Sequence, residues 1–298
     1  MDRRSALSGA GLALGSMFSV QLGAAVAVPA MALHGSVGIT ALRLICAAAA
    51  LALLVRPRLR RFDGRQWRAA LLLGLAMAGM TMAYFAAVLR IPLGAATTID
   101  FIGPLAVAAL SLKGWPRLAL PALALLGVMA ITRSATGWLL DPIGVGFALV
   151  SAAGWGSYIV LMRHVGRLFQ GQEGLCLSLL AAALASLPFA ATIDPAGLAP
   201  AQWPVAAGLA LLVPLIPYSL EMVALRRVNM GAFSILMSLE PAIGATLGFV
   251  VLAQALTLQQ GLGVAAVVLA SAGAVHFAPE TAPAEECSGN IDEDVIPG

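Results

Sequence analysis

Three charged side chains of this sequence lie inside apolar stretches that are long enough to cross a bilayer as helices. They are Arg43, Asp100 and Glu240. A charge in the middle of a membrane-spanning helix costs roughly 2.5–3.5 kcal/mol on insertion scales, so such a side chain usually faces a cavity or an opposite charge. These residues are therefore the first candidates for binding a charged or zwitterionic solute, or for carrying a proton.

Arg43 and Asp100 are expected at similar depths in the membrane. Arg43 lies seven residues into one expected helix and Asp100 lies six residues into another, and both helices run inward from the outer surface. At about 1.5 Å per residue, both side chains sit roughly 9–11 Å below that surface, which permits an ion pair. Two interpretations stay open: the pair locks the two helices together, or it opens when the carboxylate of a zwitterionic substrate binds Arg43.

Glu240 is followed by Pro241, which leaves a backbone carbonyl without its usual helical partner. Because a carboxyl group away from water holds a proton more readily, Glu240 is the candidate site for a proton or a substrate amino group. The alternative is a buried, protonated glutamate that only bonds a neighbouring helix. Glu221 is expected near the cytoplasmic end of its helix, within reach of Arg226 and Arg227, where it fits either a gate or a solvated ion pair.

All three tyrosines of the chain also fall inside apolar stretches. A buried phenol needs a hydrogen-bond partner, so a polar cavity would explain them. Trp155, in another such stretch, is expected to pack rather than to wall the cavity. The candidate residues for substrate binding and transport are Arg43, Tyr84, Asp100, Tyr158, Tyr218, Glu221 and Glu240.

The elements that carry these residues belong to a chain too apolar for a soluble domain. Of its 298 residues, 60% are hydrophobic and 10% are charged. A lipid-exposed backbone must satisfy its own hydrogen bonds, and the apolar stretches do not alternate as barrel strands do. We therefore expect an all-α membrane protein with ten transmembrane helices. The expected spans are 7–28, 36–55, 69–88, 94–112, 118–133, 143–162, 174–193, 204–225, 231–250 and 257–277.

The first span follows two arginines and could be confused with a signal peptide. Its apolar run is longer than the 7–15 residues usual for a signal peptide, so a first transmembrane helix is favoured. The chain has three cysteines, an odd number, and two of them lie in expected spans, so no disulfide framework is implied.

Basic residues predict the orientation, because positive loops stay on the cytoplasmic side. With the N-terminus inside, fourteen of the seventeen Lys and Arg residues fall in cytoplasmic segments, and only Arg90 and Arg133 fall in the opposite loops. Six of the fourteen acidic residues crowd the last nineteen positions. We therefore expect residues 278–298 to form a disordered, acidic, cytoplasmic tail, with both chain ends on the inner side of the membrane.

A weak internal repeat divides the chain into two halves. Residues 90–95 with Pro104 match residues 227–232 with Pro241 at a constant offset of 137. Because five helices are an odd number, a second set of five enters the membrane from the opposite side. The expected units are two inverted five-helix repeats, 7–133 and 143–277, which is the usual architecture of alternating access.

Several functional classes are disfavoured by what the sequence lacks. It has no Walker-type phosphate-binding loop, so ATP is not expected to drive it. Its three histidines, His34, His164 and His276, do not have the spacing of metal ligands. Neither a cofactor nor a nucleic-acid partner is expected.

Four segments carry a resemblance to a known family: 38–44, 100–107, 217–222 and 236–242. They resemble the bacterial threonine/homoserine exporters of the EamA-type, ten-helix branch of the drug/metabolite transporter superfamily. The resemblance implies two EamA-like halves in the plasma (inner) membrane that move small amino acids outward. The chain departs from the pattern at Asp100, where the family usually has glutamate, and at Gln254, where many such repeats have an acid.

We therefore expect a secondary exporter of small amino acids, coupled to inward proton movement, rather than an enzyme. Threonine and homoserine are the substrates that the resemblance favours. Nucleobases, aromatic amino acids and cationic drugs are the alternative cargoes for the same fold. A membrane-embedded enzyme or assembly factor is the alternative from a different class.

Overall fold

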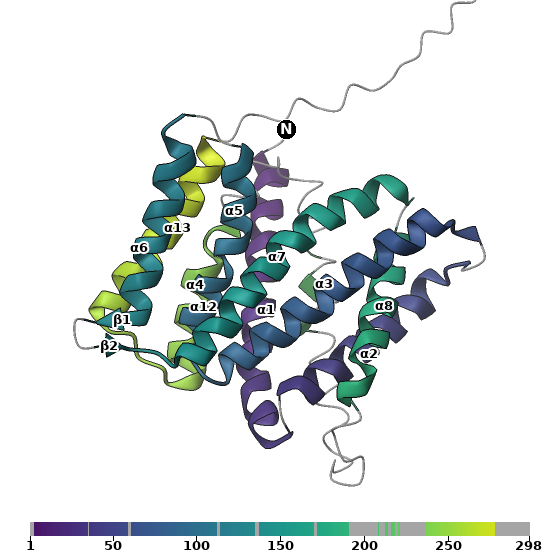
Figure 1. The fold of residues 1–298 in the computed structure, drawn as a ribbon, viewed down its shortest axis with the longest axis horizontal. Helices are drawn as coiled ribbons and strands as arrows, with labels where there is room; N and C mark the ends of the chain where they lie inside the picture. Colours follow the sequence, from purple (N-terminus) through teal and green to yellow (C-terminus); the bar gives the residue numbers. More distant parts are fainter. Residues whose placement is uncertain are drawn as a thin grey trace, which may run out of the picture.

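The computed structural model describes residues 3–34, 36–58, 61–111, 114–134, 137–169, 172–190 and 237–277, with residues 208, 212–213, 216–217 and 220. Nearly all of these residues are helical (Figure 1). The helices are α1 (Arg3–His34), α2 (Ser36–Val55), α3 (Gly64–Val88), α4 (Leu93–Asp100), α5 (Ile102–Ser111), α6 (Pro116–Thr132), α7 (Pro142–Leu168), α8 (Glu173–Ala190), α12 (Glu240–Leu252) and α13 (Leu258–His276). A minimal antiparallel ladder joins β1 (Arg133–Ser134) to β2 (Gly137–Trp138).

The helices agree with the expectation of an all-α membrane protein. Within the described ranges, five helices are long and apolar enough to cross a membrane: Ser8–Pro29, Ser36–Val55, Gly64–Val88, Pro142–Leu168 and Glu173–Ala190. Shorter apolar helices cover parts of the remaining expected spans. Most of span 204–225 and the whole acidic tail 278–298 lie outside the described residues.

Two expected spans are not single regular helices. In place of one helix over 94–112, α4 ends at Asp100, Phe101 forms a turn, and α5 begins one residue later. The cause is Pro104, which has no N–H to give to the carbonyl of Asp100, four residues before it. In the same way, a turn at 238–239 precedes Pro241, so Glu240 begins α12 instead of lying in mid-helix as expected.

Glycines allow α6 and α13 to pack backbone against backbone. A Cβ atom on Gly127 would lie 2.6 Å from the carbonyl oxygen of Gly263, and one on Gly263 would lie 2.5 Å from that of Gly127. Small residues permit this close approach between helices in a membrane. Gln259, at the start of α13, donates from Nε2 to the carbonyl of Ala130, near the end of α6, at 2.9 Å. The two helices therefore run antiparallel.

The helices α4 and α12 also cross closely and in opposite directions. A Cβ atom on Gly94 would lie 2.5 Å from the Cα of Ala245. Beyond the end of α12, Ala253 adopts a left-handed φ of 54°. This turn brings the side chain of Gln254 back, and its Oε1 accepts from the backbone N–H of Leu93 at 2.9 Å. Gln254 thus caps the first turn of α4, a role that its neutral side chain performs without a charge.

Acidic caps define the helix starts at the two ends of the bundle. Asp63 accepts from the backbone N–H of Gln66 at 2.7 Å, and the Gln66 side chain returns the bond at 3.0 Å, which is a capping box for α3. Gln66 also donates to the carbonyl of Leu168 at 2.8 Å and so ties the start of α3 to the end of α7. At the other end, Asp141 caps α7 and pairs with Arg90 at 3.3 Å.

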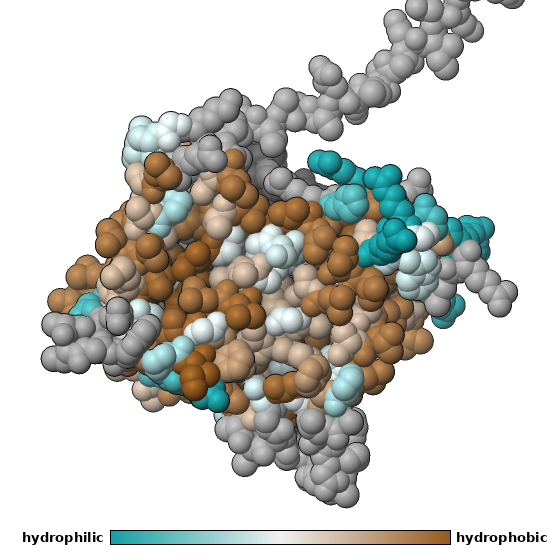
Figure 2. All heavy atoms as spheres, in the orientation of Figure 1, coloured by the Kyte–Doolittle hydropathy of each residue, from teal (hydrophilic) through white to brown (hydrophobic). Residues whose placement is uncertain are grey.

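The surface has the character of a lipid-facing one. On the face shown in Figure 2, hydrophobic residues cover most of the area, whereas hydrophilic residues gather where α3 begins and α7 ends. Leu53, Leu118 and Leu258 are 73%, 77% and 82% exposed. A wide surface of exposed aliphatic side chains is typical of a protein that contacts lipid. In Figure 1, the labelled N-terminus and the C-terminal end of α13 lie at the same end of the bundle.

Candidate functional site: a charged cavity within the bundle

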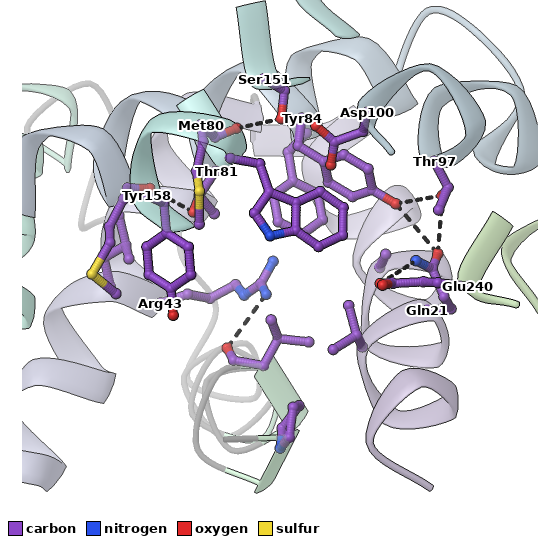
Figure 3. A pocket seen from close by; sticks show the side chains of 18 of the residues that line it. Gln21, Arg43, Met80, Thr81, Tyr84, Thr97, Asp100, Ser151, Tyr158 and Glu240 are labelled. Atoms are coloured by element: carbon purple, nitrogen blue, oxygen red, sulfur yellow. Dashed lines mark hydrogen bonds between the residues drawn. The ribbon is translucent and has the colours of Figure 1, made fainter. Parts of the chain in front are cut away.

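A cavity of about 210 Å³ lies where α1, α2, α3, α4, α7 and α8 converge on the start of α12 (Figure 3). Most of its wall is apolar, with a few polar groups that point into it, which is the usual composition of a ligand site. Five of the seven residues selected from the sequence line it: Arg43, Tyr84, Asp100, Tyr158 and Glu240.

Arg43 projects from α2 into the cavity and is only 3% exposed. Its guanidinium carbon lies 4.4 Å from the centroid of the Phe85 ring, which is a cation–π contact. The Nη2 atom donates to the backbone carbonyl of Val213 at 3.4 Å. Within the described part of the chain, Nε and Nη1 make no hydrogen bond. Arg43 therefore keeps N–H groups that can bind an anion.

Asp100 is the last residue of α4, so the break at Phe101 places its side chain at the cavity wall. It is buried, and its Oδ1 atom has no hydrogen-bond partner among the described residues. The ion pair that the sequence permitted between Arg43 and Asp100 is not formed in this structure, because Arg43 is held by Phe85 and Val213 instead. Both side chains thus face the same cavity, and each has atoms that can still form hydrogen bonds with a ligand.

Glu240 belongs to a hydrogen-bonded network that joins four helices, with Gln21 at its centre (Figure 3). Its Oε1 atom accepts from Nε2 of Gln21, on α1, at 3.2 Å. The Oε1 atom of Gln21 lies 3.3 Å from the hydroxyl of Tyr84, on α3, and 3.2 Å from that of Thr97, on α4. The two hydroxyls are 2.9 Å apart. The carboxyl group of Glu240 is therefore linked to α3 and α4 through the amide of Gln21.

The helix α7 supplies an aromatic wall. Trp155 lines the cavity and packs edge-on against Phe101, with ring centroids 5.5 Å apart. It therefore both packs and walls the cavity, whereas the sequence favoured packing alone. Tyr158 lines the cavity one turn further along α7. Ser151 donates to the carbonyl of Met80 at 3.0 Å and fastens α7 to α3 beside the cavity.

Sequence reasoning missed four polar residues of this site: Gln21, Thr81, Thr97 and Ser151. Gln21 could have been found, because a long amide inside an apolar span is a signal of the same kind as a charge. Thr81, Thr97 and Ser151 gave no such signal, since short hydroxyl side chains commonly bond back to their own helix. Tyr218 and Glu221, the other two selected residues, lie outside the described residues. In the part of the chain that the structure describes, no three His, Cys, Asp or Glu side chains are grouped as a metal site requires.

Comparison with known proteins agrees with this architecture. The EamA-like transporter family matches residues 142–275. The chain is 34% identical to the threonine/homoserine exporter RhtA of Escherichia coli (strain K12) and to that of Salmonella typhimurium (strain LT2), over 87% of this chain and 88% of each relative. The chain belongs to the EamA-like transporter family. The family resemblance expected from the four sequence segments is thereby confirmed.

Membership of this family, together with the apolar helices, makes the chain a multi-pass membrane protein that moves a solute rather than transforming one. A crystal structure of another protein superposes on it with a TM-score of 0.60 at 21% identity, over 93% of this chain and 98% of that one. At this identity the match shows only the shared fold. The charged cavity is then the natural place to look for the transported solute.

Proposed function

We propose that this EamA-family protein exports small amino acids of the threonine and homoserine type across the bacterial inner membrane by alternating access. The observation that carries the proposal is that Arg43 and Asp100, which can hold opposite charges, both face the cavity with atoms that have no hydrogen-bond partner among the described residues. Arg43 offers the N–H groups of two nitrogen atoms, Nε and Nη1, and Asp100 offers a carboxylate oxygen, from different helices. A zwitterion satisfies both ends at once, whereas an apolar or singly charged solute leaves one buried group without a partner.

The size and wall of the cavity support a small cargo. Its volume of about 210 Å³ is below the ~300–1,000 Å³ typical of pockets for drug-sized ligands. The relatives that are 34% identical to this chain over 271 residues are threonine/homoserine exporters. Tyr84 and Thr97 hydroxyls line the same space and are suitable partners for a substrate hydroxyl. The aromatic wall of Trp155 and Tyr158 is the feature that keeps nucleobases and aromatic amino acids as the second candidate cargo.

The packing of the helices supports two inverted five-helix repeats. With the sequence offset of 137, α6 is equivalent to α13, and the fourth expected span, formed by α4 and α5, is equivalent to the ninth, which contains α12. The helices α6 and α13 pack together and run antiparallel, as a two-fold axis in the membrane plane requires, and α12 packs antiparallel against α4 of the equivalent span. The equivalent prolines Pro104 and Pro241 each follow a turn. The family match over 142–275 also falls within one half.

The same geometry supports a topology with both chain ends in the cytoplasm. The arginines of the α2–α3 connection lie at the end of the bundle where α7 also finishes, since Gln66 reaches Leu168 there. At the opposite end, Arg90 is paired with Asp141. An excess of Lys and Arg residues is typical of the cytoplasmic side. The proposed coupling to protons assigns the proton to Glu240, because this carboxyl group is buried among helices that would move during alternating access.

Counterflow in proteoliposomes tests the proposal. Vesicles that contain the purified protein and unlabelled threonine should take up labelled threonine, and homoserine should compete with it. Recovery of chemically unchanged threonine excludes an enzyme. Competition by uracil, tryptophan or ethidium, with none by homoserine, would assign the cavity to the second cargo class and refute the amino-acid proposal. Vesicles without protein provide the control, and export direction follows from the efflux of threonine from loaded cells.

A further inference from the structure

We propose that Gln21 is the positioning residue that couples protonation of Glu240 to the substrate site, by reversing the direction of a hydrogen-bonded network. The inference rests on the proposed function and deepens its coupling step. Gln21 is 1% exposed and is the element that joins Glu240 to the hydroxyls of Tyr84 and Thr97. The contact between Gln21 and Glu240 connects residues 219 positions apart, so it binds the first helix to the second half of the chain.

The hydroxyl groups of this network have more acceptors than hydrogens. Each hydroxyl carries a single hydrogen. Tyr84 has two acceptors within reach, Oε1 of Gln21 at 3.3 Å and Oγ1 of Thr97 at 2.9 Å. Thr97 reaches Oε1 of Gln21 at 3.2 Å and the backbone carbonyl of Leu93 at 2.9 Å, and the Tyr84 oxygen as well. Both hydroxyls can therefore turn, and the amide of Gln21 decides in which direction.

The direction depends on the proton of Glu240. An ionised carboxylate only accepts, so it requires the NH₂ end of Gln21, and the carbonyl end then receives the hydroxyl hydrogens. A protonated Glu240 with its hydrogen on Oε1 donates to Gln21, and the amide turns end for end. Its NH₂ group then faces the two hydroxyl oxygens, which accept, and Thr97 gives its own hydrogen to the Leu93 carbonyl. The coupled proton stays on Glu240, and only hydrogen-bond directions change along the network.

This reversal reaches the substrate site through α4. Thr97 and Asp100 lie three residues apart on this eight-residue helix. A threonine hydroxyl that bonds back to the carbonyl four residues before it bends a helix slightly. Turning this bond on and off therefore moves the end of α4 that carries Asp100. Among the described residues of the cavity wall, the ionisable groups that share this space with Glu240 are Arg43, Tyr84, Asp100 and Tyr158.

Three substitutions and a matched control test the inference. Gln21→Met keeps the length of the side chain and removes both ends of the amide, and Gln21→Asn keeps an amide that is one methylene too short to reach both partners. Thr97→Val removes one hydroxyl without changing shape. Thr98→Val is the control, because Thr98 is equally buried on the same helix and does not line the cavity, and among the described residues its hydroxyl bonds only the carbonyl of Gly94, on its own helix, at 2.6 Å.

Two rates are measured for each variant in proteoliposomes: counterflow of labelled threonine without a pH gradient, and accumulation driven by an imposed pH gradient. Their ratio is independent of a loss of folded protein or of substrate affinity, since these losses lower both rates. In the wild type and in Thr98→Val the gradient drives accumulation. In the Gln21 variants and in Thr97→Val we expect the ratio to fall roughly tenfold or more, the scale of one hydrogen bond to a charged group.

The outcomes separate this inference from the proposed function. A wild-type ratio in the Gln21 variants and in Thr97→Val overturns the coupling role of Gln21 while amino-acid export stands. An equal fall in Thr98→Val also overturns it, because any disturbance of α4 would then suffice. Wild-type counterflow without any response to the gradient refutes proton coupling itself, and the inference with it. Absence of counterflow in the wild type refutes the proposed substrate.

Discussion

Arg43→Gln is the substitution that most directly tests how the cavity recognises its substrate. In the structure, the guanidinium group has two nitrogen atoms, Nε and Nη1, without a partner among the described residues. A hydrogen bond to a charged group contributes about 1.5–3 kcal/mol, and the lower value for each of two bonds amounts to about 3 kcal/mol. Because about 1.4 kcal/mol is a factor of ten, threonine binding should weaken about 150-fold. Arg43→Lys keeps the charge but loses the planar guanidinium group, so its affinity for threonine should lie between those of the wild type and Arg43→Gln.

The assay compares threonine with threoninol, in which an alcohol replaces the carboxylate. Half-saturating concentrations are measured for both compounds by competition in counterflow. The wild type should prefer threonine strongly, and Arg43→Gln should lose this preference because only threonine has a carboxylate to lose contact with. Arg90→Gln is the control: Arg90 lies outside the cavity, its side chain is 46% exposed, and both affinities should stay unchanged.

The comparison of threonine with threoninol decides whether Arg43 contacts the substrate carboxylate or only supports the packing of the helices. If Arg43→Gln weakens threonine and threoninol by the same factor, the guanidinium group does not contact the carboxylate. The cation–π contact with Phe85 would then be its main role, and Arg43 would only hold α2 and α3 at the right separation. That result would refute the assignment of the anion-binding end of the cavity.

Three further predictions concern the scaffold. Gly127→Ala or Gly263→Ala should lower the free energy of unfolding in detergent by about 1–3 kcal/mol, because the added methyl group meets a backbone carbonyl; the double substitution should cost less than the sum, and full additivity would refute the shared contact. Asp63→Ala should cost about 1 kcal/mol through loss of the α3 cap and Asp63→Ser should restore most of it, so an equal loss in both would contradict the capping role. The pKa of Asp141 lies below its ordinary 3.8, mainly because the backbone N–H of Ile143 donates to the carboxylate and, to a smaller extent, because Arg90 is close to it. Carboxyl NMR should therefore show that Asp141 loses its charge only in more acidic solution.

The sign of the Asp141 effect follows from the folded and unfolded forms. Because its pKa is lower in the folded protein, Asp141 stabilises the fold above its ordinary pKa, and this contribution disappears as the pH falls through the folded pKa. Arg90→Gln should raise the pKa only partly, since the bond from the backbone N–H of Ile143 remains. A folded pKa at or above 3.8 in the unaltered protein would contradict the structure.

Much of the site could be predicted because the cost of a charge in hydrocarbon is a local property. Arg43, Asp100 and Glu240 were selected from their apolar surroundings alone, and all three line the cavity. Asp100 lies at the end of a helix because Pro104 has no N–H to bond its carbonyl, which is also a local effect. Gln21 was available to the same reasoning, since an amide in an apolar span also needs a partner.

The partners of these residues could not be predicted. Equal depth suggested that Arg43 pairs with Asp100, but depth does not fix which faces of two helices meet. In the structure, Arg43 turns to the Phe85 ring and the Val213 carbonyl, and Asp100 is left facing the cavity.

By itself, the sequence determined that the chain is a helical membrane protein, which of its polar residues are out of place in lipid, and to which family its motifs belong. These follow from composition and from short segments, because each residue meets the bilayer independently of distant ones. Only the tertiary structure decided that Gln21 contacts Glu240 across 219 positions, and that Arg43 and Asp100 face one cavity without pairing with each other. The reason is that such contacts depend on how bent helices cross, which is set by all of their packed side chains together.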